Sequence, residues 1–73
     1  MTMEATVLQA SSGRWGTELL VRDASNQQEV LVHTSYSARC FSAGNRILIQ
    51  FDGAMTPSLP PQISASGICM LSY

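Results

Sequence analysis

The sequence predicts an all-β protein folded as one small barrel over residues 1–73. Short runs of β-branched and aliphatic residues recur along the chain, separated by clusters of Gly, Pro, Asn, Asp and Ser. No eleven-residue window keeps the helical apolar spacing i, i+3, i+4, i+7 without Gly or Pro intervening. A flat sheet of this size would leave two edges unpaired, and closure into a barrel removes them.

Five strands are expected, with turn residues marking their boundaries. They are Met3–Ala10, Thr17–Arg22, Glu29–Thr34, Arg46–Phe51 and Ile63–Leu71. Between the first two, residues 11–16 are expected to form a loop, because two glycines permit positive φ on either side of Arg14-Trp15. The strands follow one another too closely for parallel crossover connections, so the pairing is predicted to be antiparallel.

The remaining connections each carry a local signal. Asp23–Gln27 is a polar turn whose side chains can bond their own backbone. Tyr36–Cys40 has room for a single helical turn, and Asp52-Gly53 is a strong turn signal. Ala54–Gln62 contains all three prolines, so it is not a central strand. Gly67 marks a bulge or bend in the last strand.

This order of elements predicts a five-stranded antiparallel barrel, closed or partly open, of the oligonucleotide/oligosaccharide-binding (OB) type. An SH3-like barrel is the alternative. Residues 41–65 combine Gly44-Asn45, alternating aliphatic residues, Gly53 and a Ser-Leu-Pro-Pro-Gln-Ile run. This segment resembles the closing segment of small bacterial OB-like domains of unknown function, which have Asp at the position of Asn45. The resemblance implies an OB-like barrel and no particular activity; such domains are often secreted or lipid-anchored.

The composition bears on the class of partner. The chain has four Arg, no Lys and five acidic residues, for a net charge of −1, and only 12% of its residues are charged. There is therefore no diffuse positive field for nucleic acid, and copies of the chain repel one another weakly. No apolar run reaches the ~18 residues of a membrane span.

The amino-terminal segment lacks the charged and apolar regions of a signal peptide, so a cytoplasmic location is expected. Cys40 and Cys69 are then reduced and serve as small apolar residues. A leader removed before residue 1 is the alternative, and it leaves a Cys40–Cys69 disulfide open.

Residues for catalysis and metal binding are sparse. His33 is the only histidine, and the sequence nominates no second group to orient it as a general base. Two separated cysteines and one histidine fall short of the four ligands of a structural zinc site. There is no Gly-x-Ser-x-Gly elbow, and the Gly-rich loop 12–16 lacks the Lys-Ser/Thr of a phosphate loop. The sequence therefore predicts neither an enzyme nor a cofactor site.

Three aliphatic triplets suggest how the domain acts. They are Leu19-Leu20-Val21, Val30-Leu31-Val32 and Ile47-Leu48-Ile49. Because side chains alternate along a strand, the flanking residues point inward together and Leu20, Leu31 and Leu48 point outward. Either the carboxy-terminal strand or the Pro-rich loop covers these leucines, or they form a homo-oligomer interface. The main hypothesis is a non-catalytic interaction or assembly module that self-associates.

The alternative hypothesis is a weak single-stranded nucleic-acid or small-ligand binder. OB barrels bind through strands two and three and through the loops after strands one and four. Those positions hold Arg14, Trp15, Arg22, His33 and the Met55–Pro61 loop. Arg with Trp is the pair that meets phosphates and stacks on bases. In the competing interpretation Trp15 plugs the end of the barrel and Arg14 is solvated.

Overall fold

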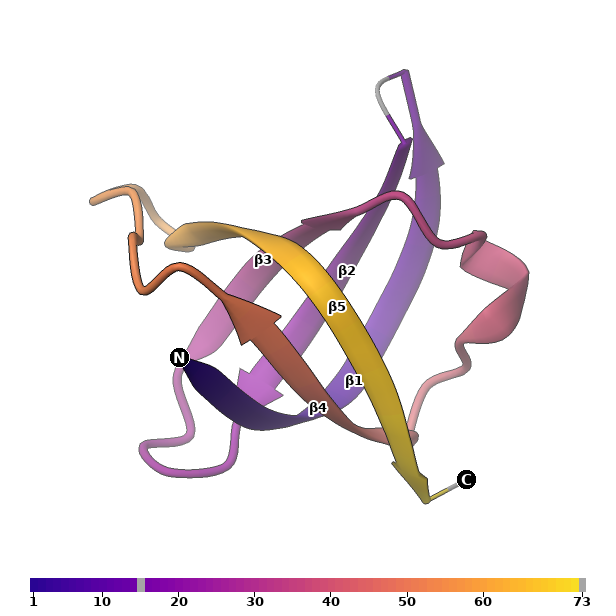
Figure 1. The fold of residues 1–73 in the computed structure, drawn as a ribbon, viewed down its shortest axis with the longest axis horizontal. Helices are drawn as coiled ribbons and strands as arrows, with labels where there is room; N and C mark the ends of the chain where they lie inside the picture. The colour runs from indigo at the N-terminus through magenta and orange to yellow at the C-terminus, as the bar shows by residue number, and fades with distance from the viewer. Residues whose placement is uncertain (15, 73) are drawn as a thin grey trace.

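A computed structural model describes residues 1–14 and 16–72 and shows a closed five-stranded β-barrel (Figure 1). Its elements are β1 (Thr2–Gly13), β2 (Gly16–Asp23), β3 (Glu29–Thr34), the 3-10 helix η1 (Ala38–Cys40), β4 (Arg46–Phe51) and β5 (Gln62–Ser72). The predicted bounds of the third and fourth strands are confirmed residue for residue, and the predicted helical turn is present as η1. The predicted loop 11–16 is wrong for most of its length, because Ser11–Gly13 pairs with Gly16–Glu18 in a hairpin.

The strands form a ring in the order β1-β2-β3-β5-β4, and β4 pairs back to β1. The prediction of a small OB-like five-stranded barrel is confirmed. The expectation of purely antiparallel pairing is wrong at one place, since β3 and β5 pair in parallel over Leu31–His33 and Gln62–Ser64. Strand direction cannot alternate all the way around a ring with an odd number of strands. One parallel pair is therefore unavoidable, and it is the shortest ladder of the barrel.

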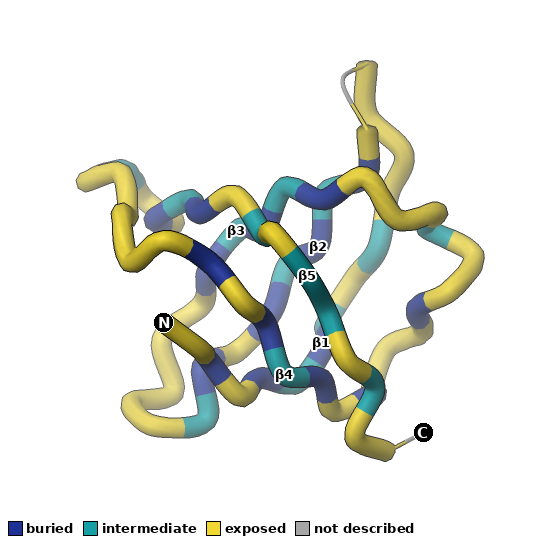
Figure 2. Tube along the Cα trace, viewed as in Figure 1, coloured by how far each residue is buried: buried dark blue, intermediate teal, exposed yellow. Residues whose placement is uncertain are grey.

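The interior of the barrel follows the predicted alternation along the strands (Figure 2). The residues that flank the middle leucines of the triplets are all fully buried: Leu19, Val21, Val30, Val32, Ile47 and Ile49. Met3, Phe41, Phe51 and Ile63 complete the filling of the barrel together with Ala5 and Val7. The middle leucines are only partly buried, so the inward and outward faces are as predicted.

Two predicted turns carry the expected side-chain bonds. The Asp23 Oδ1 atom accepts hydrogen bonds from the backbone nitrogen and the hydroxyl of Ser25, at 2.9 and 2.8 Å. The Asp52 Oδ1 atom accepts from the backbone nitrogen of Ala54 at 2.9 Å, and Gly53 takes a φ of 94° that favours glycine. Both aspartates thus fix the backbone at the end of a strand.

The Pro-rich segment between β4 and β5 forms a loop outside the sheet, as predicted. Thr56 pairs with Gln62 as an isolated bridge, and the Leu59–Pro60 peptide bond is cis. The irregularity predicted at Gly67 lies there: Gln50 pairs with Gly67 and Phe51 with Ala65, which leaves Ser66 as an extra residue. Within the described ranges, no helix is long and apolar enough to cross a membrane.

Candidate functional site

The outer face of β2 and β3 is the surface on which OB barrels bind their ligands. Three pairs of directly opposed residues form it, because the two strands run antiparallel in a regular register. From one end to the other the pairs are Arg22–Glu29, Leu20–Leu31 and Glu18–His33. An apolar pair therefore lies between two polar pairs, each of which contains one acidic residue. We call these six residues the β2–β3 face.

His33 contacts side chains of both neighbouring strands. Its Nε2 atom lies 2.8 Å from the Gln62 Oε1 atom of β5. Its Nδ1 atom lies 3.9 Å from the Glu18 Oε1 atom, and both side chains are about 40% exposed (40% and 43%). With Nε2–H donating to Gln62, the imidazole ring is oriented so that Nδ1 faces the Glu18 carboxylate.

The residues predicted to bind a polyanion do not come together. Arg22 and His33 lie at opposite ends of the β2–β3 face, about 13 Å apart along the strand direction at ~3.3 Å per residue. Each is opposed by an acid, Glu29 or Glu18. Arg14 is exposed at the turn between β1 and β2, and Trp15 lies outside the described residues. The face is therefore mixed in charge and has no continuous cationic strip.

The three outward leucines divide into two groups. Leu20 and Leu31 are Cα partners across the β2–β3 ladder. Leu48 pairs with Glu4 of β1 and Cys69 of β5, so a strand separates it from β2 and from β3 on either side. The expectation of one patch of three neighbouring leucines is wrong. The alternation of side chains along each strand determines that the three leucines face outward. The order of the strands around the barrel determines which residues lie beside them.

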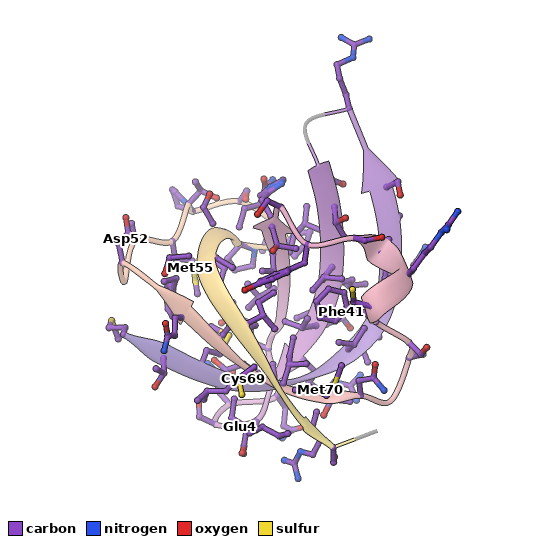
Figure 3. All side chains as sticks on the ribbon, turned by 45° about the vertical axis from the view of Figure 1, so that its right-hand side comes forward. Glu4, Phe41, Asp52, Met55, Cys69 and Met70 are labelled. Carbon is purple, nitrogen blue, oxygen red and sulfur yellow. The ribbon has the colours of Figure 1, made fainter. Side chains whose placement is uncertain are left out.

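The predicted role of the cysteines as small apolar residues also needs correction. Cys40 and Cys69 are both free and exposed, and neither belongs to the core. Their side chains therefore contribute little to the packing of the barrel. Figure 3 shows Cys69 on β5. Among the described residues, no three His, Cys, Asp or Glu side chains are placed to hold a metal ion.

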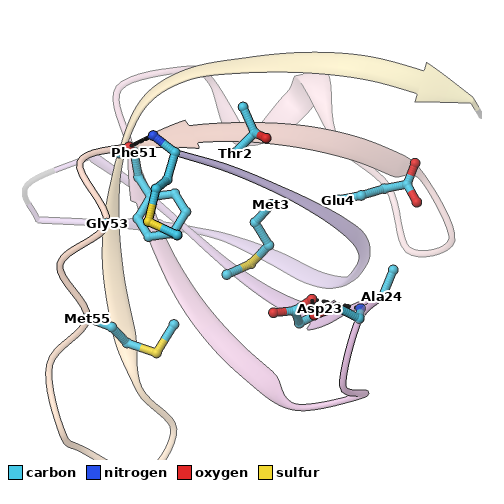
Figure 4. A pocket seen from close by; sticks show the side chains of 10 residues that line it. Thr2, Met3, Glu4, Asp23, Ala24, Phe51, Gly53 and Met55 are labelled. Atoms are coloured by element: carbon cyan, nitrogen blue, oxygen red, sulfur yellow. Dashed lines mark hydrogen bonds between the residues drawn. The ribbon is translucent and has the colours of Figure 1, made fainter.

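Two clefts open on either side of the loop that follows β4. One has a volume of about 480 Å³ and runs from His33 and Gln62 to the loop residues Asp52 and Met55. The other has a volume of about 550 Å³ and lies at the end of the barrel near the amino terminus (Figure 4). Met55 lines both clefts, so the loop is their shared wall.

Of the residues that line the second cleft, the sequence-based prediction of binding residues included only Met55, as part of the Met55–Pro61 loop. The apolar lining of this cleft comes from Met1 and Met3 of the amino-terminal segment, Phe51 at the end of β4 and Met55 of the loop. Asp23, at the end of β2, adds a buried carboxylate, and Glu4 of β1, which is paired with Arg46, adds an exposed one. These residues come from three separate stretches of the chain, and each is explained locally as core or turn. No periodicity or spacing in the sequence connects them.

Comparisons with models of protein families, with curated proteins and with solved structures give no match for this chain. The fold and the site define the class of protein: a small OB-like barrel with a mixed-charge β2–β3 face and two clefts at one loop.

Proposed function

We propose that this domain is a non-catalytic assembly module that self-associates through the β2–β3 face. The observation that carries the proposal is the position of the Leu20–Leu31 pair between two polar pairs, each with one acidic residue. Leucines that are partly exposed and directly opposed present a small apolar centre, and interfaces commonly have an apolar centre with a polar rim. The low charge of the chain opposes such association only weakly.

The charge pattern of the face favours a second copy of the same chain as the partner. A two-fold axis within the face relates two copies that stack on one another. If the axis runs along the strands, Arg22 of one copy meets Glu29 of the other. If it runs across the strands, Arg22 meets Glu18. Both arrangements bring a cation opposite an acid, and both stack leucine on leucine.

A second candidate function is weak binding of a single-stranded nucleic acid or small ligand to the same face. Its support is that Arg22 and His33 project from the two strands that OB barrels use for binding. The acids opposite both residues oppose a polyanion. A titration with mixed oligonucleotides distinguishes this candidate, because binding would quench Trp15 fluorescence in a salt-sensitive way.

The self-association proposal is tested with Leu31→Glu, which places a carboxylate at the centre of the face. Light scattering after gel filtration, repeated over a range of protein concentrations, reports the oligomeric state. We expect the unaltered protein to associate and Leu31→Glu to be monomeric, with an unchanged circular dichroism spectrum.

The matched control is Leu48→Glu, the same change at a partly buried leucine on the outer side of β4. It should leave association intact, because Leu48 is not part of the β2–β3 face. A strictly monomeric unaltered protein at all concentrations would refute the proposal, and so would equal loss of association in the two variants.

A further inference from the structure

The cleft at the amino-terminal end of the barrel is largely apolar and adaptable. Met3 is nearly buried, Met55 is 39% exposed and Met1 is 79% exposed, and all three line it together with Phe51. Thioether side chains are flexible and polarizable, so they fit apolar groups of varied shape. The volume of about 550 Å³ falls in the range of small-molecule sites, which is roughly 300–1,000 Å³.

A single buried carboxylate lies in the wall of this cleft. Asp23 is only 9% exposed, and its Oδ1 atom is occupied by two hydrogen bonds from Ser25. Figure 4 shows its side chain directed into the same space as the Met3 thioether, with Met55 reaching in from another side. Asp23 is therefore placed to meet a bound molecule between the methionines.

The charge of Asp23 lacks a partner among residues 1–14 and 16–72. The ion pairs found there join Arg46 to Glu4 at 3.5 Å and His33 to Glu18 at 3.9 Å. The amino group of Met1 also reaches the cleft, but it donates to the Phe51 carbonyl oxygen at 2.9 Å. Burying a carboxylate is costly unless a cation or donors meet it, and the two donors of Ser25 both reach Oδ1, which leaves Oδ2 available to a bound molecule.

We propose that this cleft binds a small organic cation: an ammonium group on an aliphatic or aromatic body. The ammonium group would meet the Asp23 carboxylate, because a hydrogen bond between two charged groups is stronger than one between neutral groups. The body would lie among Met1, Met3, Phe51 and Met55. The cleft is separate from the β2–β3 face, so this site goes beyond self-association and does not depend on it.

The four methionines of the chain provide the test. Three line the cleft, and the fourth, Met70, lies on β5 apart from Met55 (Figure 3). Protein labelled with ¹³C at the methionine methyl groups is titrated with n-hexylammonium and followed by NMR. We expect saturable shifts of the Met1, Met3 and Met55 methyl signals and a stationary Met70 signal. Hexanol and hexanoate, which have the same chain length, should bind more weakly, and hexanoate the least.

The variant Asp23→Asn tests the role of the charge, because the amide keeps the Oδ1 acceptor for Ser25. We expect it to weaken n-hexylammonium binding about tenfold, the loss of one charge-assisted hydrogen bond. Asp52→Asn is the matched control, since Asp52 makes the same kind of turn bond outside the cleft and should retain the affinity.

Three results would overturn the proposal: equal binding of hexanoate and hexylammonium, shifts of Met70 as large as those of the other methionines, or unchanged affinity in Asp23→Asn. If Asp23→Asn fails to fold, the comparison of the three ligands on the unaltered protein decides the question alone.

Discussion

Leu20 of β2 and Leu31 of β3 lie directly opposite each other on the outer side of the barrel. The residues next to these leucines in the sequence, such as Leu19 and Val32, are fully buried inside the barrel. The same two strands thus fill the core with one face and present an apolar pair to solvent with the other. This apolar pair, with a polar pair on either side, is the basis of the proposed self-association.

Reversing one charge on the β2–β3 face should weaken association. Arg22→Glu places a carboxylate opposite an acid of the second copy, whichever in-plane two-fold axis relates the copies. Like charges in direct opposition are destabilising, so the dissociation constant should rise. Sedimentation equilibrium over a concentration series measures the change.

Arg46→Glu is the control for that experiment. Arg46 forms an exposed ion pair with Glu4 on the other side of the barrel, so its reversal also removes an Arg–Glu contact within the chain. Association should be unaffected. An equal rise in the dissociation constant for both variants would indicate a general effect of net charge and not a contact at the face.

Truncation inside the barrel should cost far more stability than truncation of the adjacent outward residue. Ile49 is fully buried, so Ile49→Val should lose about 0.5–1.5 kcal/mol and Ile49→Ala about 2–5 kcal/mol. Since a core this small supplies only about 3–5 kcal/mol, Ile49→Ala should be close to unfolded. Urea denaturation followed by circular dichroism measures these losses. Leu48→Ala should lower the free energy of unfolding by well under half as much as Ile49→Ala does. A larger loss for Leu48→Ala would mean that Leu48 faces the core and Ile49 faces outward.

A side chain at Gly16 should destabilise the β1–β2 hairpin. Gly16 has a φ of 130°, and a Cβ atom there would lie 2.9 Å from the Thr34 carbonyl oxygen. Gly16→Ala should therefore cost about 2 kcal/mol or more, from the backbone conformation and the clash together. At this chain length each kcal/mol lowers the Tm by about 4–8 °C, so thermal unfolding resolves the effect.

Gly44→Ala separates the two causes. Gly44 has a φ of 94°, but a Cβ atom there meets nothing within 4 Å. Its cost should be limited to the backbone conformation, about 1–2 kcal/mol. A loss of Tm in Gly44→Ala equal to or greater than that in Gly16→Ala would show that the contact with Thr34 has no energetic effect.

Local signals in the sequence were sufficient for the strands and for their inner and outer faces. Glu29–Thr34 and Arg46–Phe51 were predicted to the residue because β-branched runs end there at polar or turn residues. Side-chain alternation has a period of two, so each triplet fixes which residues enter the core. The hairpin ends at Gly13 and Gly16 were missed, because Ser and Gly suit a turn or a ladder equally well locally.

The tertiary structure alone decided which strands are neighbours. Alternation carries no information about ring order, so the sequence could not show that β5 separates Leu48 from β3 or that β3 pairs with β5 in parallel. The cleft at the end of the barrel arises in the same way. Closing the ring brings the start of β1, the end of β2 and the segment after β4 to one rim, and only there do the methionines meet the Asp23 carboxylate.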